Sequence, residues 1–243
     1  IVTLTGTGTS QGVPVIGCKC RVCTSEDPRD KRLRSALSIM DRGIHIVIDA
    51  GPDFRNQMLA VGAERLDGLL ITHHHNDHIA GLDDIRPFNF KQNEEMSVYV
   101  DDICASTLQS KFDYIFAKNP YPGAPRVRLI HHNYIPFTIG HLDVIPLKVM
   151  HGKLPITAYR IGKLAYVTDA NVISEQIYDQ LNGVEVLILN ALRWEKHHSH
   201  FTIGEAIDVR VEVGRGRLRT VRGGLDPSQL EGFRVEGPDH VVL

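Results

Sequence analysis

The stretch Thr72-His73-His74-His75-Asn76-Asp77-His78 decides how this chain is interpreted, and it follows the apolar run 69–71 directly. The apolar run predicts a buried strand, which delivers three potential imidazole ligands and a carboxylate into one short loop. Imidazole nitrogen and carboxylate oxygen are ligands that zinc, manganese and iron accept. Four such groups within six residues cannot all reach one ion without strain. We therefore expect two neighbouring ions, with His73 and His75 on one and Asp77 and His78 on the other.

Paired ions of this kind hydrolyse esters and phosphodiesters in many enzymes. The alternative interpretation of the histidine stretch is a surface cluster or the remnant of a purification tag. A tract inside the chain that follows a buried strand is a poor candidate for a tag. The sequence therefore favours a hydrolytic metal centre.

The bulk properties of the chain narrow its class. A length of 243 residues suits one large α/β domain or two small ones, and a net charge of −2 predicts no general attraction to nucleic acid or anionic membranes. The sequence contains no apolar run long enough to span a membrane and no signal-peptide pattern at Ile1. Three of the four cysteines lie within six residues, which does not indicate a disulfide framework. A cytoplasmic protein without a membrane segment is expected.

Local patterns predict alternating strands and helices, interleaved with hairpins. Such alternation is typical of α/β layering around central sheets. Alternating isoleucines predict a strand over 44–48, and helical spacing over 53–62 stops at Gly62. The other expected elements are helices over 103–117 and 172–182, a stiff loop over 119–125, and strands over 68–72, 98–100, 126–130, 143–150, 156–161, 164–168 and 184–189.

Two later residues could complete a metal centre, because each follows a predicted strand. His151 ends the strand 143–150, and Asp169 ends the strand 164–168. A carboxylate is the natural bridge between two ions, since each of its oxygens can bind one. Alone, either residue would be structural; together with the histidine loop, they are candidate ligands.

This order of motifs, T-H-x-H-x-D-H followed by a lone His and then an Asp, resembles the metallo-β-lactamase superfamily over residues 1–205. The resemblance implies an αββα sandwich, two mixed sheets flanked by helices, with metals at one edge of the sheets. It implies that His73, His75 and His151 hold one metal, that Asp77 and His78 hold the other, and that Asp169 bridges them. His74 and Asn76 fall on non-ligand positions. Asp49 falls where the family has a carboxylate behind the site, although a turn cap is an equal alternative.

The amino-terminal segment carries a second metal signal. Cys18, Cys20 and Cys23 form a C-x-C-x-x-C cluster, which favours tetrahedral zinc over buried free thiols. The preceding glycine loop 6–14 could cradle a phosphate through its amides or form a plain tight turn. Together these features are similar to the cyclic phosphodiesterases of bacterial phosphonate (carbon–phosphorus lyase) operons, which resemble transfer-RNA 3′-processing endonucleases without the RNA-gripping arm. The same cysteine motif occurs in the pyrroloquinoline quinone biosynthesis B proteins.

Two further residues match positions of that phosphodiesterase pattern. His200 matches a histidine on the substrate side of the metals, where an imidazole can protonate the leaving oxygen. Arg86 matches an arginine that could steady a phosphate, although a surface salt bridge is the favoured alternative.

The tail differs from the rest of the chain and from the family. From Val209 onward it has six arginines, six glycines and no lysine, and the basic strip 215–222 lacks helical or strand periodicity. A solvated loop is expected there, with an anion- or RNA-contacting strip as the alternative. Relatives carry a T-H-x-x-H segment that completes the second metal and the cysteine zinc, whereas this tail has only His240. Either ligands have been lost, or a reading-frame error has replaced the true continuation.

We therefore expect one domain over residues 1–243 that is a metal-dependent phosphodiesterase. Its expected substrates are small cyclic or nucleotide-like phosphodiesters, attacked by a metal-bound hydroxide. The expected cofactors are two divalent ions, Zn or Mn, and one structural Zn. Nucleic acid is not an expected partner, and the chain could form a homodimer. The rival interpretations are a transfer-RNA 3′-processing-type nuclease and a non-catalytic binding protein of the quinone-biosynthesis B type.

Overall fold

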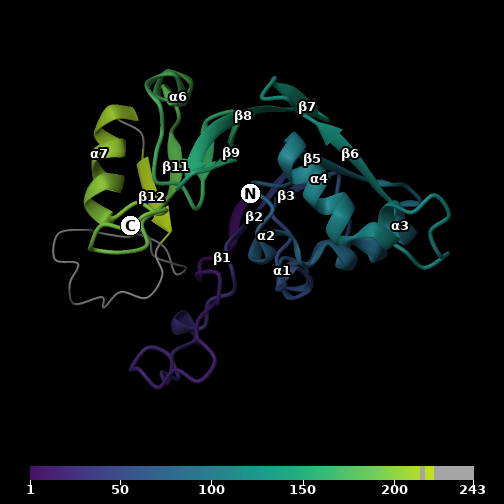
Figure 1. The fold of residues 1–243 in the computed structure, drawn as a ribbon, viewed down its shortest axis with the longest axis horizontal. Coiled ribbons are helices and arrows are strands. Elements are labelled where there is room, and N and C mark those ends of the chain that lie inside the picture. The colour runs from purple at the N-terminus through teal and green to yellow at the C-terminus, as the bar shows by residue number, and fades with distance from the viewer. Residues whose placement is uncertain (214–216, 222–243) are drawn as a thin grey trace. The chain divides into compact units, whose positions relative to one another are not determined.

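The computed structural model describes residues 1–213 and 217–221 (Figure 1). The chain divides into two compact units, one made of residues 1–6 and 34–143 and the other of residues 7–33 and 144 onward. Each unit contains the larger part of one sheet. The expected grouping of the whole chain into one domain stays a prediction.

The first unit is built on a mixed sheet with strand order β1-β2-β3-β4-β5-β6 (Figure 1). Strands β1, β2 and β3 pair antiparallel, whereas β3, β4, β5 and β6 run parallel. Parallel strands end at the same edge, so the residues that follow β3, β4 and β5 gather there. The strands span Val2–Gly6, Ala36–Asp41, Ile44–Ile48, Gly68–Leu70, Met96–Val100 and Val127–His131.

Helices of the first unit bury apolar residues against this sheet. The core includes Phe54 of α1 (Phe54–Ala60), Ile79 of α2 (Asn76–Ile79) and Leu108 of α4 (Asp102–Lys111), packed with Leu69 and Val98 of the strands. The carboxylate of Asp101 caps α4 by accepting the backbone N–H of Cys104 at 2.7 Å. Cys104 itself is buried in the core of the first unit. The remaining helical segments are η2 (Leu82–Ile85), α3 (Arg86–Gln92) and α5 (Asp113–Phe116).

The second sheet is also mixed and has the strand order β12-β11-β10-β9-β8-β7. Strands β8, β9 and β10 pair antiparallel, and β10, β11 and β12 pair parallel. Two helices, α6 (Glu175–Leu181) and α7 (Ile203–Val213), contribute to the core of the second unit. The strands span Phe137–Ile139, Leu142–His151, Leu154–Ile161, Leu164–Val167, Val186–Asn190 and Arg217–Val221. Two mixed sheets flanked by helices confirm the expected α/β class.

The structure corrects several expected elements. The helix expected over 103–117 is two helices, because Phe112 leaves the helical conformation between α4 and α5. The loop expected over the basic strip 215–222 is wrong for Arg217–Val221, which form β12 by pairing with β11. The sequence also did not predict α3 or β7. Residues 214–216 and 222–243, including His240, lie outside the described residues.

None of the helices in the described ranges is long and apolar enough to cross a membrane. This agrees with the absence of a long apolar run in the sequence.

The end of β3 lies against the histidine stretch with almost no space between the backbones. The backbone N–H of Ala50 donates to the carbonyl of His78, and that of Gly81 donates to the carbonyl of Ala50, both at 2.8 Å. A Cβ on Gly51 would lie 2.0 Å from the carbonyl oxygen of Asp77. Glycine is therefore required at position 51 for the two segments to meet.

Substitution Gly51→Ala should destabilise the protein, because the added methyl must push the Asp77 backbone away. We expect a loss of about 1–3 kcal/mol in the free energy of unfolding, typical of an overpacked interior. Denaturant-induced unfolding measures this loss. The matched control is Gly204→Ala in α7, where the nearest atom would lie 4.0 Å from the new Cβ. That control should be neutral or slightly stabilising, and equal stability of both variants would contradict the close approach.

Candidate metal centre

The histidine stretch brings four candidate ligands together at the carboxyl edge of the first sheet. It follows β4, and its last part forms the short helix α2. The Nε2 atom of His73 lies 3.0 Å from Nδ1 of His75, and Nε2 of His78 lies 3.3 Å from a carboxylate oxygen of Asp77. The rings of His73 and His78 are buried and their centroids are 4.1 Å apart. The four predicted ligands of this loop therefore form one compact set.

A buried carboxylate, Asp49, holds this set from behind. It directly follows β3 and is fully buried. One of its oxygens accepts the backbone N–H of Thr72 at 2.8 Å, and the other accepts the Thr72 hydroxyl at 2.8 Å and Nδ1 of His78 at 2.7 Å. Burial raises the pKa of Asp49, and the interactions with His78 and Thr72 oppose that shift. A carboxylate bonded to an imidazole in this way is the support that metal-bound histidines usually have.

These hydrogen bonds fix which nitrogen of each buried ring carries the proton. The single hydroxyl proton of Thr72 goes to Asp49, so the Thr72 oxygen must accept from Nδ1 of His73, 3.0 Å away. His78 likewise gives its Nδ1 proton to Asp49. Both rings then present Nε2 as an electron-pair donor, and that of His78 faces the Asp77 carboxylate. Electron-pair donors that face one another suit a cation, so this set fits a divalent metal ion.

A second set of candidate ligands lies in the second unit. His151 ends β8, Asp169 follows β10, and His200 precedes α7. One potential ligand atom from each of these residues lies within 4.8 Å of the others. The Nδ1 of His151 donates to the carbonyl of Ser199 at 2.8 Å, which leaves Nε2 as the electron-pair donor. The sequence predicted all three residues, but it did not predict that Ser199 would orient His151.

His200 lies in an environment that disfavours its charged form. Burial lowers its pKa to about 4, although Asp169 opposes this shift from a distance of 4.0 Å. A neutral imidazole can bind a metal, whereas a general acid must hold a proton when the reaction begins. The position of His200, with a ligand atom within 4.8 Å of those of His151 and Asp169, suits a ligand, and the expected role as general acid stays a prediction.

The two sets belong to different units of the chain. That His73, His75 and His151 share one ion, and that Asp169 bridges two, therefore stay predictions.

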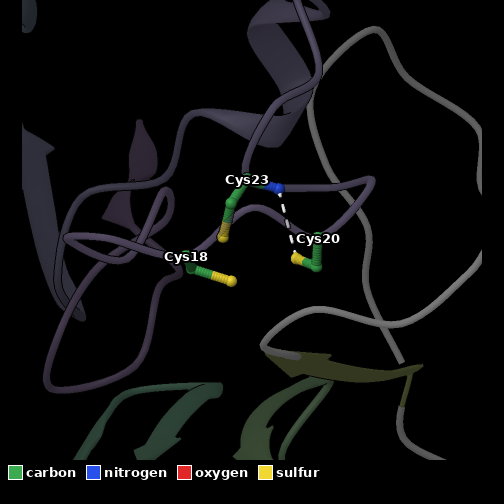
Figure 2. Close-up of side chains that lie close together, drawn as sticks. All are labelled: Cys18, Cys20 and Cys23. Carbon is green, nitrogen blue, oxygen red and sulfur yellow. Dashed lines mark hydrogen bonds between the residues drawn. The ribbon is translucent and has the colours of Figure 1, made fainter.

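The three clustered cysteines point their sulfur atoms toward one another in the amino-terminal segment (Figure 2). Their Sγ atoms lie within 4.8 Å of each other. Cys18 and Cys20 are exposed and Cys23 is partly exposed, so the alternative of buried free thiols is wrong. Hydrogen bonds, the largest from the backbone of Cys23, lower the pKa of Cys20 to about 7. Since thiolates are the form that binds zinc, the cluster fits a zinc ion.

The glycine loop before the cysteines contains a tight turn. The backbone N–H of Gly12 donates to the carbonyl of Thr9 at 2.8 Å, and Gly12 has a φ of +67°. This is the plain turn that the sequence offered as an alternative to a phosphate cradle.

Arg86 makes a surface ion pair with Asp83 at 2.7 Å, which is the salt bridge that the sequence favoured for this residue. Its guanidinium also donates to the carbonyl of Gly123 at 3.5 Å. A role of Arg86 in substrate binding stays a prediction.

Sequence reasoning missed Lys111, whose ammonium donates to the carbonyl of His74 at 3.1 Å and to the side chain of Asn76 at 2.9 Å. No sequence signal marked this lysine, because its partners lie 35 or more residues away.

Comparison with known proteins gives a consistent family and mixed activities. A family model described as "Beta-lactamase superfamily domain" matches residues 45–221. A crystal structure of a diphosphatase from the PhnP family is 34% identical, with a TM-score of 0.85 over 91% of this chain and 85% of that one. The coenzyme PQQ synthesis protein B of Methylobacterium nodulans is 29% identical over 222 residues, which are 76% of this chain and 70% of that protein.

An octanoyltransferase of Porphyromonas gingivalis is 44% identical over 214 residues. These residues are 87% of this chain but only 43% of that relative. This chain therefore spans less than half of the octanoyltransferase, and the activity in that protein's name is not assigned to the shared part.

Substitution Asp49→Asn should weaken metal binding, because an amide cannot accept from Thr72 and His78 with both of its heavy atoms. Loss of such a supporting carboxylate typically costs about 10–100-fold in metal affinity. Competition with a chromophoric chelator measures the affinity for Zn and Mn. The matched control is Asp102→Asn, which alters an exposed carboxylate paired with the exposed His131. If both variants bind metal like the wild type, Asp49 has no supporting role.

Replacing Cys18, Cys20 and Cys23 together by serine should remove one zinc per chain and lower the melting temperature. Zinc bound by thiolates stabilises the folded loop, so its loss removes folding free energy. Elemental analysis and thermal unfolding measure the two effects, with the exposed Lys19→Ala of the same loop as the control. A triple variant that keeps its zinc and its stability but loses turnover would place these thiols in the chemistry.

Proposed function

The chain belongs to the metallo-β-lactamase superfamily, and on that premise we propose that it is a metal-dependent phosphodiesterase. Its proposed substrates are small cyclic or nucleotide-like phosphodiesters. One observation carries the proposal: the Asp49 network presents two buried imidazole nitrogens beside a carboxylate, at the sheet edge where the superfamily pattern expects metal. The similarity to a solved phosphoryl-transfer enzyme, the PhnP-family diphosphatase, supports the same class of chemistry.

The proposed ligands follow the expected pattern. His73, His75 and His151 would hold one ion, Asp77 and His78 the other, and Asp169 would bridge them. Such ions, when bound, supply Lewis acidity toward phosphoryl oxygens and lower the pKa of water.

The chain itself orients these groups. Asp49 fixes the His78 ring and, through Thr72, the His73 ring, while the carbonyl of Ser199 fixes the His151 ring. Rigid imidazoles reduce the reorganisation needed when charge develops on the phosphoryl group. His200 would then either protonate the leaving oxygen or occupy a ligand position. Removing an acid would leave the metal content nearly unchanged, whereas removing a ligand would release metal.

Four other functions are rivals to this proposal. The diphosphatase relative favours cleavage of a phosphoanhydride instead of a phosphodiester, by the same class of phosphoryl transfer. The similarity to a PQQ synthesis protein B favours binding without turnover. The octanoyltransferase relative suggests an acyl substrate. A transfer-RNA 3′-processing activity is a fourth candidate, but the sequence shows no long basic arm.

A substrate panel separates these functions. Manganese- or zinc-loaded protein should hydrolyse bis-p-nitrophenyl phosphate and cyclic phosphodiesters, and an octanoyl thioester should remain intact. Preference for a diphosphate would select the phosphoanhydride candidate, and turnover of none of the substrates would support the non-catalytic candidate.

We also propose a cytoplasmic setting, consistent with the exposed thiols, and a homodimer, which size-exclusion chromatography would test.

Two substitutions should separate the roles of Asp169 and His200. Asp169→Ala should abolish turnover and release metal, because one carboxylate would serve two ions. His200→Ala should slow turnover by about 10²–10⁴-fold, typical of a lost general acid, with metal content nearly unchanged. The measurements are initial rates with bis-p-nitrophenyl phosphate and metal content after dialysis.

The controls are Asp179→Ala and His198→Ala, which alter exposed groups of the same unit and should leave both measurements unchanged. If His200→Ala loses metal as readily as Asp169→Ala, His200 is a ligand and not the acid.

A further inference from the structure

An exposed aromatic ring is held in place by neighbouring segments of the first unit. Tyr121 lies in the proline-rich loop between α5 and β6, and 52% of its surface is exposed. Its ring stacks on that of Tyr114, with centroids 6.4 Å apart and planes inclined by 24°. A Cβ on Gly123 would lie 2.9 Å from the Tyr121 ring, so the ring also packs closely on the backbone at Gly123. Two contacts therefore fix the ring while about half of its surface remains open.

Polar contacts brace both partners of this ring. The hydroxyl of Tyr114 donates to Asp83 at 2.6 Å, and Asp83 pairs with Arg86 at 2.7 Å. The Arg86 guanidinium then donates to the carbonyl of Gly123 at 3.5 Å. Arg86 thus ties the loop of Tyr121 to the start of α3, which is a positioning role.

The same group of helices contacts the histidine stretch directly. Lys111, at the end of α4, donates to the carbonyl of His74 and to the side chain of Asn76. Tyr114 lies three residues after Lys111 in the next helix, α5, and Asp83 lies in η2, five residues beyond His78. The tyrosine pair is thus held by η2, which follows the histidine stretch in the chain, and lies close in sequence to Lys111, which contacts that stretch.

From this arrangement we infer that Tyr121 is a stacking platform for the base of a nucleotide substrate. The inference rests on the proposed phosphodiesterase function and narrows its substrate class to nucleotides. A fixed, half-open aromatic ring offers a nucleobase a preorganised face, and stacking requires no particular base. A base-free phosphodiester would gain nothing from this ring.

Equilibrium binding to the manganese-loaded protein tests the inference without requiring turnover. The probes are adenosine 5′-monophosphate and ribose 5-phosphate, which differ only by the base. The wild type should bind the nucleotide about tenfold more tightly than the sugar phosphate, near the lower end of base–aromatic stacking. Tyr121→Ala should reduce this ratio to about one without changing the affinity for ribose 5-phosphate, whereas Tyr121→Phe, which keeps the ring, should retain the ratio.

Gly123→Ala should also lower the ratio, because its methyl would displace the ring, and it provides the same test if Tyr121→Ala does not fold. A wild-type ratio near one, or an unchanged ratio in both Tyr121→Ala and Gly123→Ala, would overturn the inference. Turnover is measured separately: a chain that prefers the nucleotide but hydrolyses nothing would refute the phosphodiesterase and keep the stacking platform.

Discussion

The buried carboxylate of Asp49 is the constraint on which the first unit depends. Removing a carboxylate from water is costly unless donors replace the lost solvation. Here the replacement donors are the backbone and hydroxyl of Thr72 and the ring of His78. Because those donors belong to the histidine stretch, the requirement to solvate Asp49 also fixes the stretch against the end of β3. The stability of the unit and the geometry of the candidate site therefore have one cause.

The second unit positions its carboxylate differently. Asp169 follows β10, and the next residue, Ala170, is held by the side chain of Asn190 through two hydrogen bonds of 2.9 Å. Asn190 is the last residue of β11, the strand that pairs with β10 in parallel. The position of Asp169 is thus set by an amide on the neighbouring strand that bonds the backbone of the following residue.

The sequence predicted what depends on local pattern and residue chemistry. The strand over 44–48 has the predicted bounds because β-branched isoleucines recur at every second residue, and the cysteine cluster converges because its members are close in sequence. Contacts between distant segments were not predictable. Strand β12 forms because it pairs in parallel with the edge of β11, and no periodicity in Arg217–Val221 predicts that pairing. Lys111 and Ser199 were missed for the same reason, since their roles arise only when separate elements meet.

The backbone conformation of Asp49 and of Asp169 limits which residues each position can accept. Asp49 has a φ of +69° and Asp169 a φ of +55°, a region that Asp and Asn tolerate better than most other residues with a side chain. Exchange for glutamate, the usual chemically conservative step, would lengthen the side chain and also strain the chain itself. Substitution at these two positions is therefore restricted mainly to small polar residues that tolerate a positive φ. None of the candidate histidine ligands, all of which lie in the described part of the chain, has a positive φ, so exchange at those positions would meet no such limit from the backbone.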